Sequence, residues 1–537
     1  MQDWWRGSVT YQVYPRSFQD SDGNGIGDLP GITRRLDHIA ALGVDAVWLS
    51  PIFTSPMADM GYDVSDYTDI DPLFGTLADF DALVARAHAL GLKVIIDQVI
   101  NHCSARHPAF VESRASRDNP KADWFVWADP RPDGTPPNNW LSVFGGPAWE
   151  WDTRRRQYFL HHFLPSQPDF NFHHPEVQDW HLANMKFWLD RGVDGFRLDT
   201  VNYYFHDALL RSNPPEPRND VTPAVNPNDM QDQIYSKTQP ENIGFLQRIR
   251  ALVDTYPDRA MVGEVGEGRR AVQVMAAYTK GNDRLHMAYS FDMLGPEFTP
   301  DHFRRRIEGF FSGAPDGWPC WAFSNHDVIR HVTRWAGHGA QDDLARLCGA
   351  MLLSFQGSVC LYQAEELGQT ETDILWEELT DPPGFAFWPE YKGRDGCRTP
   401  MVWDAGAQGG FTTGTPWLPV KPPQLARNAA SQTGRTGSVL ETYRSLMAFR
   451  RAMSALRDGT TTFLDLPAPL LAFRRIKGDD TLTCLFNLSP EPQRLTVTGA
   501  SLTGPAQAAS LDGNTLSLGP NAFAFLSAAG QGGVTIT

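Results

Sequence analysis

The stretch DRGVDGFRLDT (190–200) is the third of three segments that share one layout, after ALGVDAVWLSP (41–51) and ALGLKVIIDQV (89–99). In each segment the pattern of an amphipathic helix ends at a glycine, and a short apolar run follows. The glycine stands where the end of a helix favours a left-handed residue. A helix followed by a buried strand, repeated along the chain, is typical of parallel β/α units.

The same alternation continues along the chain and gives eight apolar runs of strand length. Eight parallel strands joined by helices predict a closed (β/α)8 barrel, the TIM-barrel fold of the α/β class. We expect the strands over residues 9–14, 46–49, 93–97, 195–199, 261–265, 288–291, 321–324 and 359–362.

Two departures from this regular layout indicate additional domains. Gly91 and Gly192 lie about twice as far apart as Gly43 and Gly91, so a segment rich in Pro, Trp and Asn is inserted after the third strand. Beyond a helix expected over 442–456, short alternating runs such as TLTCLFNLS (481–489) indicate antiparallel β-structure. We therefore expect a barrel domain over 1–102 and 170–455, a small inserted domain over 103–169, and a C-terminal antiparallel β-sandwich over 456–537.

The composition of the 537-residue chain excludes several classes of partner. A formal net charge of −16 and a pI near 5.4 argue against binding nucleic acid or an anionic membrane, so we expect a neutral or small substrate. The six cysteines are scattered without C-x-x-C spacing, which predicts free thiols in a reducing compartment. The start, MQDWWRGSVT, lacks the features of a signal peptide, and no run of about 18 apolar residues occurs. We expect a cytoplasmic protein without a membrane segment and predict no particular oligomeric state.

Acidic side chains follow several of the expected strands. Side chains alternate along a strand, so Arg197 and Asp199 lie on one face, where the guanidinium favours the ionised carboxylate. Alone, such a pair is more often structural than catalytic. Glu264 and Asp327, however, stand at the ends of two other strands, where barrel enzymes place their chemistry. A carboxylate nucleophile with a second carboxyl group as acid and base points to glycoside chemistry.

Seven motifs extend this interpretation. In order along the chain, they are YQVYPRSF (11–18), DQVINH (97–102), QPDFN (167–171), GFRLDTVN (195–202), VGEV (262–265), FSNHD (323–327) and RTPMVWD (398–404). Together they resemble the motifs of the retaining α-amylase superfamily, glycoside hydrolase family 13. Within that family the resemblance is to the α-glucosidase and oligo-1,6-glucosidase branch.

This resemblance implies a covalent, retaining mechanism. It makes Asp199 the nucleophile that forms a β-glucosyl-enzyme, Glu264 the general acid and base, and Asp327 the residue that binds sugar hydroxyls and distorts the ring. For retention, the carboxyl groups of Asp199 and Glu264 should lie about 5 to 5.5 Å apart, and Glu264 needs a raised pKa. Dense contacts around one glucose imply a blind pocket and exo action. The residues implied are Tyr62 for stacking, Asp63, His102, His326 and Arg398 for hydroxyl contacts, and Arg197 for holding the nucleophile charged.

A loop near the start of the chain has the spacing of a metal site. In DSDGNGIGD (20–28) side-chain oxygens recur at alternate positions, as at the start of an EF-hand loop, but Gly31 replaces the final glutamate. On the residues alone, such a run is more often a solvent-exposed turn. The family resemblance implies instead a structural Ca²⁺ or Mg²⁺ ion, and no organic cofactor. The implied ligands are Asp20, Asp22, Asn24, Asp28 and the carbonyl of Ile26.

The residue after the nucleophile, Thr200, bears on the choice of linkage. In this branch threonine there accompanies a preference for α-1,4 bonds and valine a preference for α-1,6 bonds. The resemblance therefore implies an exo-acting α-glucosidase for maltose and similar short glucosides, with transfer of glucose to other acceptors as a side reaction.

Four alternatives are weighed against this function. A sucrose-acting transglucosylase or isomerase would intercept the same intermediate, and an oligo-1,6-glucosidase would differ in linkage. A catalytically silent relative, such as the heavy chain of an amino-acid transporter, would have a transmembrane helix and altered catalytic positions, which this sequence does not show. A carbohydrate-binding module would leave the paired acid and nucleophile unexplained.

Overall fold

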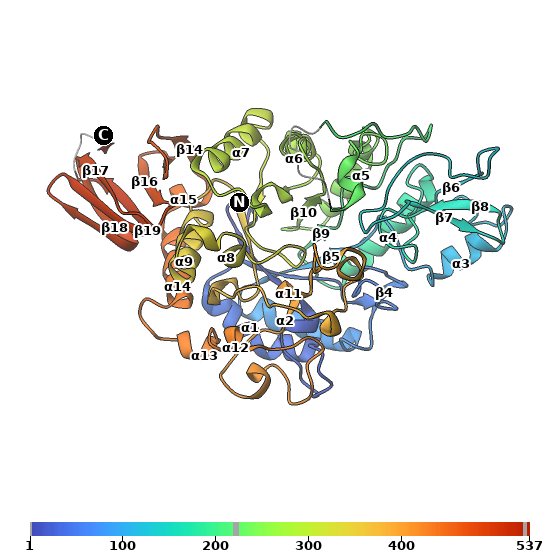
Figure 1. The fold of residues 1–537 in the computed structure, drawn as a ribbon, viewed down its shortest axis with the longest axis horizontal. Helices are drawn as coiled ribbons and strands as arrows, with labels where there is room; N and C mark the ends of the chain where they lie inside the picture. The colour runs from blue at the N-terminus through green and yellow to red at the C-terminus, as the bar shows by residue number, and fades with distance from the viewer. Residues whose placement is uncertain (1–2, 218–224, 530–533, 537) are drawn as a thin grey trace.

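The computed structural model describes residues 3–217, 225–529 and 534–536, and a barrel of eight parallel strands lies at its centre (Figure 1). The strands predicted from the sequence are present, with small differences at their ends. Their hydrogen-bonded order is β11-β10-β9-β5-β2-β1-β13-β12, and a parallel bridge between Ala288 and Pro319 closes the ring. The strands are β1 (Val9–Val13), β2 (Ala46–Leu49), β5 (Lys93–Gln98), β9 (Gly195–Leu198), β10 (Ala260–Val265), β11 (Met287–Ser290), β12 (Cys320–Trp321) and β13 (Ser358–Tyr362).

Helices cover the outside of the barrel because each buries one apolar face. In α1 (Leu29–Leu42) the side chains of Ile32, Leu36 and Ile39 are fully buried, and the carboxylate of Asp28 caps the first turn. The other long helices are α2 (Leu77–Ala89), α4 (Pro175–Asp190), α5 (Asn242–Val253), α6 (Ala271–Thr279), α7 (Pro300–Gly313), α9 (Gln341–Leu352) and α14 (Val439–Ala452). The loops after β12 and β13 and the chain that leads to α14 contain shorter helices, which are α8 (His331–Arg334), α10 (Pro382–Phe387), α11 (Asp395–Arg398), α12 (Pro422–Leu425) and α13 (Ala429–Gln432).

The three repeated segments form one side of the barrel. Their glycines adopt the left-handed conformation, with φ of 88° at Gly43, 78° at Gly91 and 94° at Gly192. The strands that follow these glycines, β2, β5 and β9, are neighbours in the sheet. The repeated layout in the sequence therefore corresponds to three adjacent β/α units of the barrel.

Two of the connections between barrel strands form additional small sheets before α4. The chain between β2 and α2 forms the hairpin of β3 (Phe53–Thr54) and β4 (Asp66–Ile70). The segment after β5 forms a small antiparallel sheet in the order β6-β8-β7, at the right of Figure 1. Trp140 and Trp149 stack in its apolar centre with ring centroids 5.8 Å apart, so these tryptophans serve packing. The elements of this segment are α3 (Pro108–Ala115), β6 (Trp127–Ala128), β7 (Trp149–Asp152) and β8 (Gln157–Leu160).

The C-terminal strands are antiparallel, as predicted, and lie at the left of Figure 1. The first half of β19 pairs with β17 and its second half with β16, so one long strand connects the two parts of this domain. The helix expected over 442–456 is instead two helices, because α14 already begins after its cap Ser438 and is followed by α15 (Ser454–Asp458). The strands are β14 (Thr460–Phe463), β15 (Leu470–Lys477), β16 (Asp480–Asn487), β17 (Gln493–Thr498), β18 (Ala500–Asp512), β19 (Thr515–Ala528) and β20 (Thr535–Ile536).

Buried arginines join this domain to the barrel. The guanidinium of Arg475, on β15, donates to the carbonyls of Ser354 at 2.6 Å and Gly459 at 2.7 Å. Arg450, on α14 of the barrel domain, donates to the carbonyl of Leu456 at 2.8 Å. Each arginine thus satisfies a carbonyl of the other domain, Arg475 that of Ser354 and Arg450 that of Leu456, and these bonds help to hold the two parts together.

Two expectations about the chain as a whole can be compared with the structure. All six cysteines lie in the described part of the chain, and they are buried and unpaired, as predicted. Among the described residues, no helix has both the length and the apolar character needed to cross a bilayer.

Replacing Arg475 by Met should destabilise the protein without affecting catalysis. The substitution leaves buried carbonyls without donors, and we expect the free energy of unfolding to fall by about 2 to 4 kcal/mol, measured by denaturant unfolding. The neighbouring Arg474→Met is the matched control, because Arg474 is only partly buried and donates to the carbonyl of Val534, within the C-terminal domain. Equal stability of the two variants would contradict this account of the domain contact.

Candidate active site

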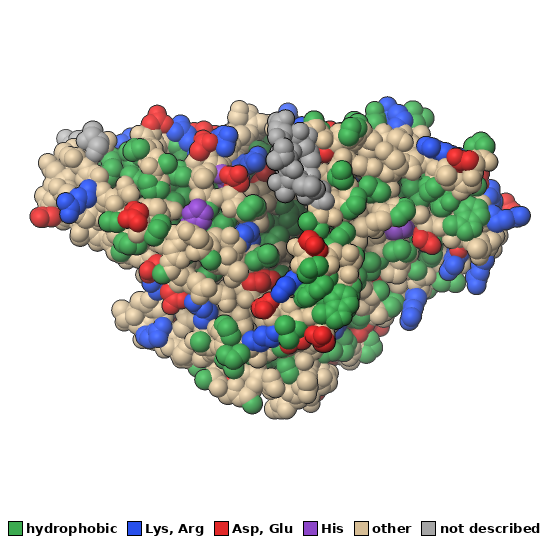
Figure 2. Space-filling view, viewed as in Figure 1, with side chains coloured by type: hydrophobic (Ala, Val, Ile, Leu, Met, Phe, Trp, Pro, Cys, Tyr) green, Lys and Arg blue, Asp and Glu red, His purple; other side chains and the backbone are tan. Residues whose placement is uncertain are grey.

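The three carboxylates predicted to be catalytic lie at the end of the barrel where the strands finish. Asp199 follows β9, Glu264 lies in β10 and Asp327 follows β12. All three line one cavity of about 470 Å³, which Figure 2 shows as a hollow in the middle of this face. Parallel strands deliver their carboxyl ends to one face, so the fold brings together residues that are distant in the sequence.

The fully buried guanidinium of Arg197 joins these groups into one cluster. Its Nη1 lies 2.7 Å from Asp199 and 2.8 Å from Asp97, and its Nη2 lies 2.6 Å from Glu264. It also donates to the hydroxyl of Tyr289 from Nε at 3.2 Å and from Nη2 at 3.0 Å. One positive charge thus faces three carboxyl groups, which favours keeping one of them protonated.

The pKa values of the two central carboxyl groups lie on either side of 7. Burial raises the pKa of Glu264 to about 8, with Arg197 opposing the rise and the charge of Asp199 adding to it. Burial also raises the pKa of Asp199, but only to about 6, because Arg197 favours its charged form. At pH 7 the pair therefore presents a protonated Glu264 and an ionised Asp199, the combination that a retaining mechanism requires.

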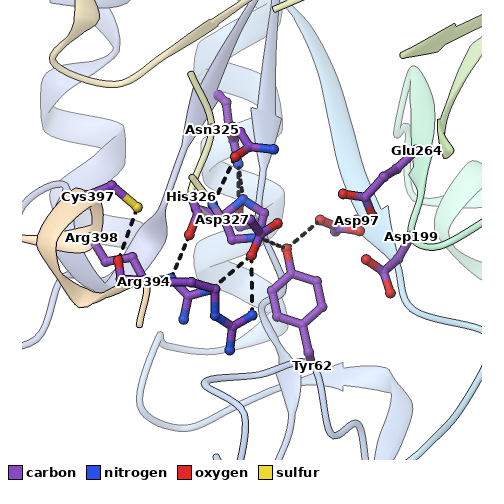
Figure 3. A network of polar contacts seen from close by, with 12 residues as sticks. Tyr62, Asp97, Asp199, Glu264, Asn325, His326, Asp327, Arg394, Cys397 and Arg398 are labelled. Atoms are coloured by element: carbon purple, nitrogen blue, oxygen red, sulfur yellow. Dashed lines mark hydrogen bonds and ion pairs between the residues drawn. The ribbon is translucent and has the colours of Figure 1, made fainter. Parts of the chain in front are cut away.

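Asp327 has a different environment from the other two carboxylates. Burial opposes its charge, but His326, Arg394 and Arg398 outweigh this effect and hold the pKa of Asp327 below its usual range. Because burial lowers the pKa of His326 to about 3, the positive charge at pH 7 comes from the arginines. Arg394 Nη1 and Arg398 Nη2 approach Asp327 Oδ1 at 3.2 and 3.1 Å (Figure 3). Asp327 thus stays ionised and can accept hydrogen bonds from sugar hydroxyls.

Tyr62 and His102 line the cavity, as their predicted contacts with a sugar require. The hydroxyl of Tyr62 lies 2.5 Å from His326 Nε2 and 3.2 Å from Asp97 Oδ2, and Figure 3 shows these groups together. His326 is buried and stacks on Tyr62 with ring centroids 5.3 Å apart. Among the residues described, the cavity wall does not include His326, so this histidine reaches the site through Tyr62 and Asp327.

Asp63 does not line the cavity, contrary to the sugar contact expected of it. It is fully buried, and its carboxylate accepts hydrogen bonds from the Ser55 hydroxyl at 2.9 Å and from the backbone N–H groups of Ala58 and Asp59 at 3.0 Å. These bonds close the turn between β3 and β4. We therefore correct the role of Asp63, which shapes the turn that presents Tyr62.

The same turn supplies an acid that the sequence reasoning missed. Asp59 lines the cavity, 2.7 Å from Nη2 of Arg394, which lines it as well. The arginine expected to contact sugar, Arg398, is fully buried, and its Nε donates to the carbonyl of His326 at 2.7 Å. The sequence did contain a signal for Arg394. It stands four residues before Arg398, and residues four apart lie on the same side of a helical turn, so the two arginines could be expected to lie close together.

Thr200 contacts both of the central carboxyl groups. Its backbone N–H donates to Glu264 Oε2 at 3.2 Å, and its hydroxyl donates to Asp199 Oδ2 at 3.3 Å. Its φ is 41°, a left-handed conformation that costs a β-branched residue about 1 to 3 kcal/mol. A hydrogen bond from Val201 N–H to the carbonyl of Glu264 at 2.9 Å holds this backbone in place. The side chain of Thr200 also lines the cavity.

Aromatic side chains form much of the remaining wall. They come from the inserted segment, from the loops after β9 and β11, and from the region around α10 that follows β13. The sequence reasoning did not identify them, because aromatic residues in loops follow no period. They are Phe144, Phe163, Tyr203, Phe291, Phe387 and Tyr391.

This geometry agrees with the relationships of the chain. Residues 12–459 match the family described as alpha amylase, catalytic domain. The chain belongs to the α-amylase family. It is a glycoside hydrolase of family 13, as its motifs predicted.

Members of the α-amylase family that resemble this chain are named for different reactions. A probable alpha-glucosidase of Rhizobium meliloti is 57% identical over 495 residues, which cover 91% of this chain and 90% of that protein. The solved structure of the alpha-glucosyl transfer enzyme XgtA shares 50% identity with a TM-score of 0.95, covering 98% of this chain and 100% of the other. The trehalulose synthase MutB of Pseudomonas mesoacidophila shares 32% identity with a TM-score of 0.88, covering 99% of each chain.

The predicted metal loop has a donor set that fits the expected ion. Carboxylate oxygens of Asp20, Asp22 and Asp28 lie within 4.8 Å of one another. Oxygen donors at such spacing suit Ca²⁺ or Mg²⁺. The side-chain oxygen of Asn24 accepts the N–H of Ile26 at 2.8 Å and so helps to close the loop. These residues stay our predicted ligands.

The contacts of this loop favour a structural role. The backbone N–H of Asp20 donates to the carbonyl of Phe411 at 3.0 Å, and the hydroxyl of Thr412 donates to the carboxylate of Asp20. The loop thus fastens the segment that follows the RTPMVWD motif. None of its side chains is part of the described cavity wall.

Activity should depend on pH with a maximum near 7. Protonation of Asp199 below a pKa of about 6 removes the nucleophile, and deprotonation of Glu264 above a pKa of about 8 removes the proton donor. We therefore expect kcat/KM for an α-glucoside to fall on both sides of the maximum. Glu264→Gln should lose activity on substrates with poor leaving groups and should no longer show the alkaline limb. An alkaline limb that persists in this variant would contradict the assignment.

Added Ca²⁺ or Mg²⁺ should stabilise the protein through the loop at 20–28. An ion at a hundredfold excess over its Kd adds about 2.7 kcal/mol to the free energy of unfolding, measured by thermal denaturation before and after chelation. Asp22→Asn keeps an acceptor oxygen but removes a charge, so the stabilisation should shrink. Glu150→Gln, an exposed acid outside the loop, is the control. If neither Ca²⁺ nor Mg²⁺ changes the melting temperature of the wild-type protein, the predicted site is wrong.

Proposed function

We propose that this enzyme is a retaining α-glucosidase that removes a terminal glucose from short α-glucosides. The observation that carries the proposal is the cluster of Asp199 and Glu264 around Arg197, with pKa values on either side of 7. Asp199 attacks the anomeric carbon to form a glucosyl-enzyme while Glu264 protonates the departing oxygen. Glu264 then takes a proton from the incoming water, which releases glucose with its configuration retained.

Exo action is supported by the two kinds of lining in the cavity. The charged groups of Asp59, Asp327 and Arg394 lie together and suit the hydroxyls of one glucose. The aromatic side chains suit the less specific surface of an aglycone. In this proposal the terminal glucose occupies the charged end, and the bond to be broken lies between Asp199 and Glu264.

The α-1,4 preference rests on Thr200. Its contacts with both carboxyl groups support a position beside the scissile bond, where its hydroxyl and methyl groups touch the first residue of the aglycone. An oligo-1,6-glucosidase is the alternative for which valine at this position would be expected. We therefore propose that maltose is cleaved in preference to isomaltose.

Transfer of glucose is a second candidate reaction. The observation that favours it is the 50% identity and TM-score of 0.95 with the alpha-glucosyl transfer enzyme XgtA. Transfer and hydrolysis use the same glucosyl-enzyme, and they differ only in whether water or an alcohol attacks it. We propose hydrolysis as the main reaction at low substrate concentration, with transfer to sugars increasing at high concentration.

Following maltose, isomaltose, sucrose and maltotriose by NMR tests this proposal. We expect maltose to be hydrolysed faster than isomaltose, with α-glucose as the first product. Thr200→Val should move the ratio of the two rates toward isomaltose by about tenfold, because a change of one small group beside the substrate is worth about 1 to 3 kcal/mol. Thr68→Val, on β4, is the control that should leave the ratio unchanged.

Two outcomes would overturn the proposal. Wild-type enzyme that cleaves isomaltose much faster than maltose would contradict the linkage preference. Asp199→Asn should lose activity by about a thousandfold or more, as expected for a nucleophile. Full activity in that variant would show that the assignment of the catalytic residues is wrong.

A further inference from the structure

Tyr203 lies where the catalytic cavity meets a second one. It lines both the cavity at Asp199 and Glu264 and an adjoining polar cavity of about 820 Å³. Its backbone N–H donates to the carbonyl of Thr200 at 2.9 Å, which fixes it relative to the residue beside the scissile bond. Its ring lies against Phe163, another wall residue, with ring centroids 5.7 Å apart.

A buried lysine holds the hydroxyl of this tyrosine. Lys237 is only 6% exposed, and its Nζ donates to the hydroxyl of Tyr203 at 3.1 Å and to the carbonyl of Gly266 at 2.7 Å. The ammonium group lies 4.7 Å from the centre of the Tyr203 ring, and Glu267 provides the nearby negative charge. Lys237 therefore links the loop after β9, which follows Asp199, to the loop after β10, which follows Glu264.

The chemistry of these two groups determines the direction of the hydrogen bond. An ammonium group has donors and no acceptor, so the oxygen of Tyr203 must accept from Lys237. The phenolic hydrogen is then free to be donated elsewhere. Within the described residues, the hydroxyl of Tyr203 makes no hydrogen bond as a donor. A donor polarised by an adjacent cation therefore stands in a wall that carries several aromatic side chains.

We propose that Tyr203 is a specificity residue on the aglycone side, and that Lys237 is the positioning residue that orients its hydroxyl. The phenolic hydrogen is donated to an oxygen of a second sugar, bound either as leaving group or as acceptor. The favoured ligands are thus hydroxylated aglycones, and sugars are distinguished from flat aryl groups, which offer no oxygen at this place. This inference rests on the proposed α-glucosidase function, and it identifies the class of aglycone that the site favours.

Comparing two substrates isolates this hydrogen bond. Maltose has a sugar as its aglycone, and phenyl α-glucoside has a ring without hydroxyl groups. In Tyr203→Phe we expect the ratio of kcat/KM for maltose to that for phenyl α-glucoside to fall about three- to tenfold, as for the loss of one neutral hydrogen bond. Tyr158→Phe is the matched control, because the Tyr158 hydroxyl bonds to the carbonyl of Gly134 outside the cavity, and it should keep the wild-type ratio.

A double variant tests the role of Lys237. Lys237→Met should lower the same ratio. The loss of its bond to the carbonyl of Gly266 can change the rates for both substrates, but it should change them equally and so leave the ratio unaffected. The double variant Tyr203→Phe/Lys237→Met should lower the ratio no further than Tyr203→Phe alone, because Lys237 acts on the aglycone through the phenol. Melting temperatures of the variants show whether each is folded, and Tyr203→Phe removes a single oxygen atom.

Each outcome separates the inference from the proposed function. A wild-type ratio in Tyr203→Phe overturns the role of Tyr203, and additive losses in the double variant overturn the positioning role of Lys237. Wild-type enzyme that cleaves neither substrate overturns the α-glucosidase function itself, and this result appears before any variant is made.

Discussion

The structure of this site depends on one buried guanidinium. Arg197 lies inside the barrel, where an unpaired cation would be strongly unfavourable, and it is compensated by Asp97, Asp199 and Glu264 from three adjacent strands. A single cation cannot balance three anions, so the least stabilised carboxyl group keeps its proton. The ion cluster that allows Arg197 to be buried therefore also gives Glu264 and Asp199 the different protonation states that the proposed mechanism needs. In that mechanism, catalysis and the stability of the barrel end share the same groups.

The fold could be predicted because its signal is repeated along the chain. Three helix–glycine–strand segments occupy adjacent positions in the sheet, so an error in one would have been corrected by the others. The prediction was less accurate at β12, which pairs only over Cys320–Trp321. There the chain leaves the sheet early, and Asn325 accepts the backbone N–H of Asp327 at 2.9 Å. Periodicity contains no information about such local bonds, so the sequence could not show where this strand ends.

The positions of site residues could be predicted where a motif lies at the end of a barrel strand. They were harder to predict where the conformation of a loop determines which side chains face the cavity. Asp199 and Glu264 are fixed by β9 and β10, so their positions follow from the barrel. In the turn after β3, by contrast, Asp63 faces inward to close the turn and Asp59 faces the cavity. Both are aspartates within five positions, and only the hydrogen bonds of the folded turn distinguish them. The aromatic wall lies beyond sequence reasoning for the same reason, because loop residues have no period to mark them.

The relatives described above are named as a probable alpha-glucosidase, an alpha-glucosyl transfer enzyme and a trehalulose synthase, so their names give different reactions within one family. In the function proposed here, the choice depends on what occupies the aglycone side when the glucosyl-enzyme forms. We place part of that side at the loops after β9 and β10, which Lys237 joins through Tyr203 and Gly266. The proposed aglycone wall is therefore joined to the loops that follow Asp199 and Glu264. Loss of Lys237 would remove both of its hydrogen bonds, whereas loss of the Tyr203 hydroxyl would leave the bond to Gly266 in place, so these two substitutions separate contact with the aglycone from the connection of the two loops.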